Sequence, residues 1–273
     1  MKLITENNNI ISFDEKEIIK HSLGTIYITD KVSYCVFNKN IEQKFINNID
    51  NLYTLQYPNK EAKQICETYT FLLKNYYYLQ TGEYVLEFNK IETDIPLRNF
   101  LEYFEYNLDF KHIAWILNRL YSISCLLYYN DIAHNGFILD NFLINPEYHA
   151  IMLLGGWEYS KPIGKKLDGI NINIWNQMPD YIKIQKTSTP TIDLYMIKQL
   201  ARKMCGYESV EDFKLNKDKL IKENNATEEM IIFLTQPPTG TPIEEFEHWE
   251  NIIKNAYGER KFIPLSIDYK KIY

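Results

Sequence analysis

One long apolar segment constrains this chain more than any other feature: residues 113–129, IAWILNRLYSISCLLYY. Its apolar residues recur every three or four positions, the spacing of one helix face; they are Ile113, Ile116, Leu117, Leu120, Ile123 and Leu127. A membrane helix needs about 20 apolar residues, and an arginine at its centre costs roughly 2.5 to 3.5 kcal/mol. Since Asn118 and Arg119 lie near the middle, the segment predicts a buried helix of a globular protein.

The composition agrees with that class of protein. Hydrophobic residues make up 45% and charged residues 24% of 273 residues, which is ordinary for a globular chain with room for one bilobal domain or two small ones. A net charge of −6 argues against a nucleic-acid partner. The first residues, MKLITENNNIISF, show no basic region followed by an apolar run, so we expect no signal peptide, no membrane partner and a cytoplasmic protein.

The cysteines lie far apart and form no CxxC pair; they are Cys35, Cys66, Cys125 and Cys205. A disulfide framework or a cysteine metal site needs a closer and more regular spacing. We therefore expect reduced, mostly buried thiols and no metal site.

Strand patterns dominate the first third of the chain and helix patterns the rest. The expected early elements are a hairpin over 24–39, a helix over 40–56, a strand over 69–75 (YTFLLKN) and two strands over 76–88 that turn at Thr81-Gly82. The expected later helices are 96–104 with Pro96 in first position, 113–129, 191–205 ending at Gly206, 208–222, 227–235 and 243–258, with an irregular stretch from about 160 to 190. This order predicts an α+β protein with a small β-rich N-lobe over 1–92 and a larger helical C-lobe over 93–273, together one domain.

Residues 132–160, IAHNGFILDNFLINPEYHAIMLLGGWEYS, carry the functional signal. In this stretch the chain resembles the protein kinase fold, and the resemblance extends over roughly residues 20–262. A kinase catalytic loop reads His-Arg-Asp, then four residues, then Asn. Here those positions hold His134, Asn135, Gly136 and Asn141, directly after the long helix.

Two later stretches extend the resemblance. The kinase triplet Asp-Phe-Gly falls on Gly155, Gly156 and Trp157. Asp193, in TPTIDLYMIKQL, resembles the buried aspartate that starts the central helix of a kinase C-lobe. The resemblance implies that Asp193 has a structural role and accepts hydrogen bonds from backbone N–H groups of the catalytic-type loop.

A narrower resemblance concerns GGWEYSKPIGKKL, TSTPTIDLYM and WENIIKNAYGERKF. These stretches look like kinase-like proteins of bacteria and their phages that are often labelled chaperone-like. This resemblance implies the cytoplasm of a bacterial or phage-infected cell and a protein partner, and Phe262 is expected to hold the tail on the C-lobe.

Phosphoryl transfer needs a base, metal-binding carboxylates and a phosphate-binding lysine, and most of these groups are missing at the matching positions. Gly136 and Gly155 replace the two aspartates, and only Asn141 remains as a weak Mg²⁺ ligand. The lysine position falls on Phe37, or on Lys39 if the alignment shifts, with Glu42 as a possible partner. Gly24 is the only glycine before Gly82, so the glycine-rich loop is missing too.

Other polar residues are interpreted as structural. Asp140 or Asp131 could replace the lost base only within about 3 Å of the substrate hydroxyl, so we interpret them as loop carboxylates. We expect His134 to hydrogen-bond the backbone and hold its loop, and Trp157 to pack in the core beside the former metal site.

The sequence thus predicts a catalytically impaired kinase-like protein, a pseudokinase that acts as a protein-binding or regulatory scaffold. One alternative is an atypical phosphotransferase or nucleotidyltransferase that uses the same cleft with ATP and Mg²⁺. Another is a component of phage particles, of their assembly or of host takeover. No cofactor is expected under the favoured hypothesis.

Overall fold

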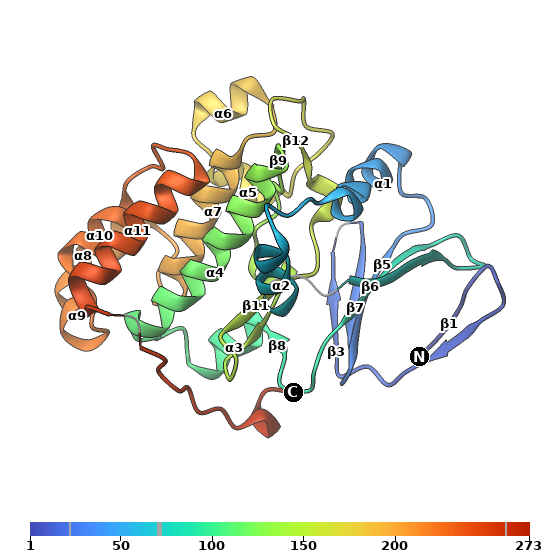
Figure 1. The fold of residues 1–273 in the computed structure, drawn as a ribbon, viewed down its shortest axis with the longest axis horizontal. Helices are drawn as coiled ribbons and strands as arrows, with labels where there is room; N and C mark the ends of the chain where they lie inside the picture. Colours follow the sequence, from blue (N-terminus) through green and yellow to red (C-terminus); the bar gives the residue numbers. More distant parts are fainter. Residues whose placement is uncertain (22, 70–72, 260) are drawn as a thin grey trace.

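An antiparallel sheet in the order β3-β4-β5-β7-β6 forms the N-lobe of the computed structural model (Figure 1). The structure describes residues 1–273 except 22, 70–72 and 260. The strands are β3 (Glu17–Lys20), β4 (Gly24–Ile28), β5 (Val32–Phe37), β6 (Leu73–Tyr78) and β7 (Tyr84–Asn89), and a separate hairpin joins β1 (Lys2–Ile4) and β2 (Ile10–Ser12).

Both predicted hairpins of the N-lobe are confirmed. In the first, β4 pairs with β5, with Gly24 opposite Phe37. A Cβ on Gly24 would lie 2.3 Å from the carbonyl oxygen of Val36, so the two strands approach closely only because this residue is glycine. In the second, β6 pairs with β7, and Gly82 has the positive φ of +91° that its turn requires.

The N-lobe helices differ in part from the prediction. The expected helix over 40–56 is present as α1 (Gln43–Ile49) followed by a 3₁₀ helix (Asp50–Thr54). The strand predicted over 69–75 is wrong at its start, because Tyr69 ends helix α2 (Lys60–Tyr69); residues 70–72 lie outside the described residues, and 73–75 belong to β6. Helix α2 was not expected from the sequence, although Ala62, Ile65 and Cys66 recur at helical spacing within it.

The C-lobe is helical, as predicted. Its helices are α3 (Leu97–Tyr103), α4 (Phe110–Tyr129), α5 (Ile172–Gln177), α6 (Asp180–Gln185), α7 (Pro190–Lys203), α8 (Val210–Leu215), α9 (Lys217–Glu223), α10 (Glu228–Thr235) and α11 (Pro242–Tyr257). Three details of the prediction are wrong. Pro96 caps α3 rather than starting it, the stretch 160–190 contains α5 and α6, and 208–222 is two helices that meet at Asn216.

Short strands attach the functional loops to the helical core. β10 (Phe142–Asn145) lies between β8 (Ile95–Pro96) and β11 (Ala150–Leu153) in a small sheet, and β9 (Ile132–Ala133) pairs with β12 (Lys161–Pro162). The loop 134–141 therefore starts and ends on strands, and so does the loop 154–160.

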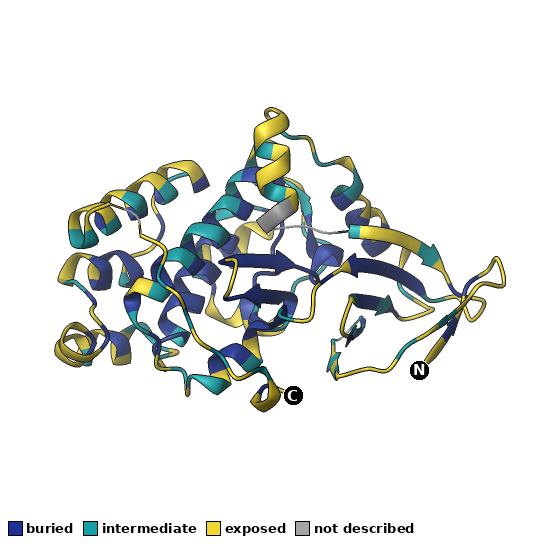
Figure 2. Cartoon of the chain, turned by 60° about the horizontal axis from the view of Figure 1, so that its bottom comes forward, coloured by how far each residue is buried: buried dark blue, intermediate teal, exposed yellow. Residues whose placement is uncertain are grey.

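One hydrophobic core runs through both lobes, with α4 at its centre. Figure 2 shows the strands of this core in dark blue, whereas β6, which follows the grey trace, is largely yellow. Cys35, Cys66, Cys125 and Cys205 form no disulfide within the described residues; Cys35 and Cys205 are buried, whereas Cys66 and Cys125 are only partly buried, so the expectation of mostly buried thiols holds for two of the four. Among the described residues, none of the helices has both the length and the apolar character needed to cross a bilayer.

Candidate functional site: a closed interlobe cleft

The two lobes meet where β4 and β5 face the loop that follows β11. The Cδ1 atom of Ile26 lies 3.1 Å from the position that a Cβ would occupy on Gly155. The Cys35 thiol, in turn, donates a hydrogen bond of 3.4 Å to the carbonyl oxygen of Leu154. The cavity between the lobes that Phe37 and Gly156 help to line measures about 10 Å³. This volume holds at most about one water molecule.

The amide of Asn141 fills the space beside the two glycines of the second loop. A Cβ on Gly155 would lie 2.5 Å from Asn141 Oδ1, and a Cβ on Gly156 would lie 2.6 Å from Asn141 Nδ2. Asn141 Nδ2 also donates a 2.7 Å hydrogen bond to the carbonyl oxygen of Gly136. Gly156 has a φ of +85°, which favours glycine independently of the contact. Asn141 and both glycines therefore form one close-packed unit.

Asp193 ties the first loop to α7. Its two carboxylate oxygens accept hydrogen bonds from the backbone N–H groups of His134 and Asn135, each 2.8 Å long. Burial raises the pKa of Asp193 to about 7, and the two N–H donors oppose that rise. The hydrogen bonds expected from the sequence are thus present.

His134 differs from the expectation for its ring. The backbone N–H of His134 is bonded to Asp193, but within the described chain neither ring nitrogen has a hydrogen-bonding partner. The ring lies edge-on to Trp157, with centroids 4.9 Å apart, and edge-on to Phe137 at 5.5 Å. Burial lowers the pKa of His134 to about 3, so the ring is neutral and acts as an aromatic core group. Trp157 is completely buried in the same core.

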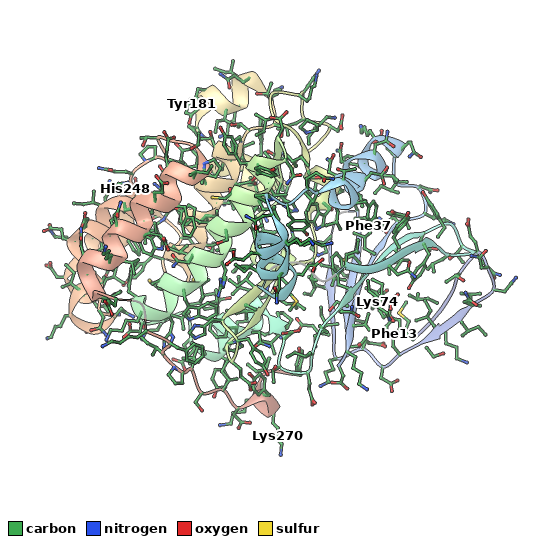
Figure 3. The ribbon with its side chains drawn as sticks, in the orientation of Figure 1. Phe13, Phe37, Lys74, Tyr181, His248 and Lys270 are labelled. Carbon is green, nitrogen blue, oxygen red and sulfur yellow. The ribbon has the colours of Figure 1, made fainter. Side chains whose placement is uncertain are left out.

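The residues proposed for the phosphate-binding lysine and its partner lie in different places. Phe37 is buried at the end of β5, below α1 in the view of Figure 3. Lys39 and Glu42 are exposed and line a separate surface groove rather than the cleft. Glu42 forms an ion pair with Lys44 at 3.0 Å. The structure therefore does not bring Lys39 and Glu42 together with Asn141 and Gly155.

The carboxylates considered as substitute bases also point elsewhere. Asp140 accepts two hydrogen bonds from the guanidinium of Arg98 on α3, at 2.5 and 2.6 Å. Asp131 is exposed at the end of α4 and has a φ of +57°. Neither residue lines the cavity between the lobes.

Comparison of the whole structure with known proteins decides the architecture. The chain superimposes on the structure of vaccinia related kinase 3 with a TM-score of 0.63, covering 93% of this chain and 90% of that one at 12% sequence identity. It has a protein-kinase-like fold. No family model and no curated protein matches the sequence, and the likeness to bacterial and phage proteins stays a prediction.

In this kinase-like fold, Asn135 stands at the arginine position of the His-Arg-Asp motif. Its backbone adopts a φ of +58°. Its side-chain nitrogen Nδ2 donates hydrogen bonds to Ala133 O, Tyr159 O and Ser188 Oγ, all between 3.0 and 3.1 Å. Kinases commonly order the segment after Asp-Phe-Gly by pairing arginines with a phosphate group. Here the uncharged amide of Asn135 holds that segment directly.

Helix α1 and the turn after it hold the same segment from the other side. Asn48 donates a 3.0 Å hydrogen bond to Glu158 O, and Asn51 donates one of 3.1 Å to Ser160 O. The hydroxyl of Ser160 donates to Asn48 O at 2.8 Å. Sequence reasoning missed these residues, because asparagine and serine are common in loops and no spacing marks them as partners.

Glu158 is a further residue that the sequence did not reveal. Its side chain lines the small cavity between the lobes and is 3% exposed. Burial raises the pKa of Glu158 to about 7, although the backbone N–H groups of Glu158 and Gly156 favour the ionised form. It is an acid within the cleft, but it lies three residues past the triplet aspartate position.

Glu158 makes a pH dependence of stability testable. Its pKa in the folded chain, about 7, lies above the ordinary value of 4.5. The stabilisation that the protonated carboxyl of Glu158 gives the folded chain is therefore fully present below about pH 4.5 and is lost as the pH rises through 7. Between pH 5 and pH 8 the free energy of unfolding should fall less in Glu158→Gln than in the wild type, and the difference should be up to about 3 kcal/mol. Urea denaturation of both proteins at several pH values measures this, and parallel pH profiles would contradict it.

Proposed function

We propose that this kinase-like chain is a pseudokinase, impaired in phosphoryl transfer, whose closed lobes serve as a protein-binding or regulatory scaffold in the cytoplasm. The observation that carries the proposal is the filled cleft. Ile26 and Cys35 rest on the backbone of Leu154 and Gly155, and the cavity beside them measures about 10 Å³. Ligand sites for molecules of nucleotide size usually measure about 300 to 1,000 Å³.

The charge pattern supports the same proposal. A kinase stabilises the transferred phosphoryl group with two metal ions, a lysine and a loop aspartate. Gly136 and Gly155 stand at the aspartate positions, and the lysine position falls on Phe37, or on Lys39 if the alignment shifts. Within the described residues, no group of three or more acidic, histidine or cysteine side chains is placed to hold a metal ion.

The surface offers tyrosines suited to protein contacts, which are enriched at protein interfaces. Tyr76 is 54% exposed on the edge strand β6, and Tyr148 and Tyr181 are 60% and 50% exposed on the C-lobe. We therefore expect a protein partner to bind at these surfaces rather than in the closed cleft.

Thermal unfolding with nucleotide tests the proposal. A ligand at 100 times its dissociation constant stabilises by about 2.7 kcal/mol, which shifts the melting temperature by on the order of 5 °C. We expect no shift at millimolar ATP with Mg²⁺ or Mn²⁺, relative to metal ion alone. A shift that needs both nucleotide and metal would overturn the proposal and favour an atypical phosphotransferase or nucleotidyltransferase.

A further inference from the structure

A large cavity lies in the C-lobe, away from the interlobe cleft. It measures about 640 Å³ and is formed by α4, α11 and the tail that follows α11. Figure 1 shows α4 and α11 running side by side, with the tail passing below the C-lobe toward β8. This volume falls within the range of small-molecule sites, whereas the interlobe cavity does not.

Stacked rings build one wall of the cavity. Trp115 stacks on His149, with ring centroids 4.3 Å apart and an interplanar angle of 1°, and His149 stacks on Phe262 at 4.1 Å. Hydrogen bonds also hold His149 in place. Arg119 Nε donates a hydrogen bond of 2.7 Å to the carbonyl oxygen of His149, and His149 Nε2 lies 3.2 Å from the carbonyl oxygen of Ile263. Burial lowers the pKa of His149. The wall is therefore neutral, aromatic and held on both sides before any ligand arrives.

Phe246 and Tyr257 of α11 add two more aromatic rings to the lining. Planar aromatic rings favour offset-stacked or edge-to-face contact with other rings, worth about 0.5 to 1.5 kcal/mol beyond the buried area. A flat aromatic ligand uses such a lining better than a branched aliphatic one does.

The charges that line the cavity are mainly basic. Among the described residues, Lys111, Arg119 and Lys261 line it together with one acid, Glu259. The acid Glu250 also contacts the lining, where Oε1 accepts a hydrogen bond from Asn118. The whole chain has a net charge of −6, whereas the lining of this cavity is locally basic. The cavity therefore attracts anions although the molecule as a whole is negatively charged.

We infer that this cavity binds a planar aromatic molecule carrying an anionic group, with the ring against Trp115 and Phe246 and the anion toward Lys111 and Lys261. Size, aromatic lining and basic rim together select this class. The inference is independent of the pseudokinase proposal, because no residue of the interlobe cleft takes part.

The probe is 1-anilinonaphthalene-8-sulfonate, and N-phenyl-1-naphthylamine is its counterpart without the sulfonate. Fluorescence titration of the full chain with the sulfonate should show one saturable site with a dissociation constant on the order of 10 to 100 μM. We expect the uncharged counterpart to bind at least about fivefold more weakly at low salt, with a smaller difference at high salt.

Variants place the binding at this cavity. Trp115→Ala and Phe246→Ala should each weaken sulfonate binding by about tenfold, and the double variant Lys111→Gln with Lys261→Gln should remove the preference for the charged probe. Trp175→Ala, on α5 and outside the lining, is the matched control and should leave binding unchanged. The lysine pair is exposed, so that variant keeps the test valid if an aromatic replacement prevents folding.

Three results would overturn the inference. They are the absence of saturable binding at about 1 mM probe, equal affinity for the charged and uncharged probes, and unchanged binding in folded Phe246→Ala and lysine-pair variants. Circular dichroism establishes folding of each variant beforehand.

Discussion

Replacing Gly155 by aspartate will destabilise the protein and will not create an ATP site. The substitution restores the carboxylate with which a kinase holds Mg²⁺, but its Cβ would lie 2.5 Å from Asn141 Oδ1 and 3.1 Å from Ile26 Cδ1. Overpacking a filled site costs about 1 to 3 kcal/mol, and a buried unpaired charge costs more. We expect the free energy of unfolding to fall by about 3 kcal/mol or more, as measured by urea denaturation, with no heat of MgATP binding by calorimetry.

Two further variants separate steric and electrostatic causes. Gly155→Ala brings the same Cβ contact without a charge and should give an intermediate loss. Gly164→Asp adds an aspartate where nothing lies within 4 Å of its Cβ, so only its φ of +79° costs stability, about 1 kcal/mol. A Gly155→Asp protein as stable as the wild type, or one that binds MgATP, would show that the cleft opens more readily than its packing implies.

Several elements of this fold could be predicted because local spacing defines them. The apolar stripe from Ile113 to Leu127 predicts α4, and strand alternation with Thr81-Gly82 predicts the β6–β7 hairpin. The loop around His134 could be placed because a long helix, a fixed number of residues and a short hairpin surround it. A bilobal α+β fold follows from the order of these elements, and the likeness to vaccinia related kinase 3 confirms that fold.

Closure of the cleft could not be predicted, because it depends on residues far apart in the sequence. The contact of Cys35 with Leu154 spans 119 positions, and that of Asn48 with Glu158 spans 110. No periodicity connects such pairs. Helix α2 was missed for a different reason: Ala62, Ile65 and Cys66 do recur at helical spacing, but this stripe is short and the rest of the helix is polar.

The same distinction explains why the sequence revealed glycines at the acid positions of the motif but not the polar groups that hold the loops. Gly136 and Gly155 are noticed because a motif assigns acids to those positions. Asn135 and Ser160 are noticed only once the structure shows their partners. A kinase-like chain without the metal-binding acids still needs its loops fixed, and here neutral amides and hydroxyls fix them.

Replacing Asp193 by alanine will destabilise the protein strongly. The substitution leaves the buried N–H groups of His134 and Asn135 without acceptors. Each unsatisfied buried donor costs about 1 to 3 kcal/mol, so we expect the free energy of unfolding to fall by about 3 to 5 kcal/mol. Hydrogen exchange should also show lost protection at these two amides beyond the global change, because their only acceptors in the described structure are the Asp193 oxygens.

Matched variants define what the loss means. Asp193→Asn keeps one acceptor oxygen and should cost about half as much as the alanine variant. Asp218→Ala removes an exposed aspartate from the first turn of α9 and should change stability by less than about 1 kcal/mol. If Asp193→Ala costs no more than Asp218→Ala, or if the His134 and Asn135 amides stay protected, then packing of the His134 ring against Trp157 and Phe137, rather than Asp193, holds the loop.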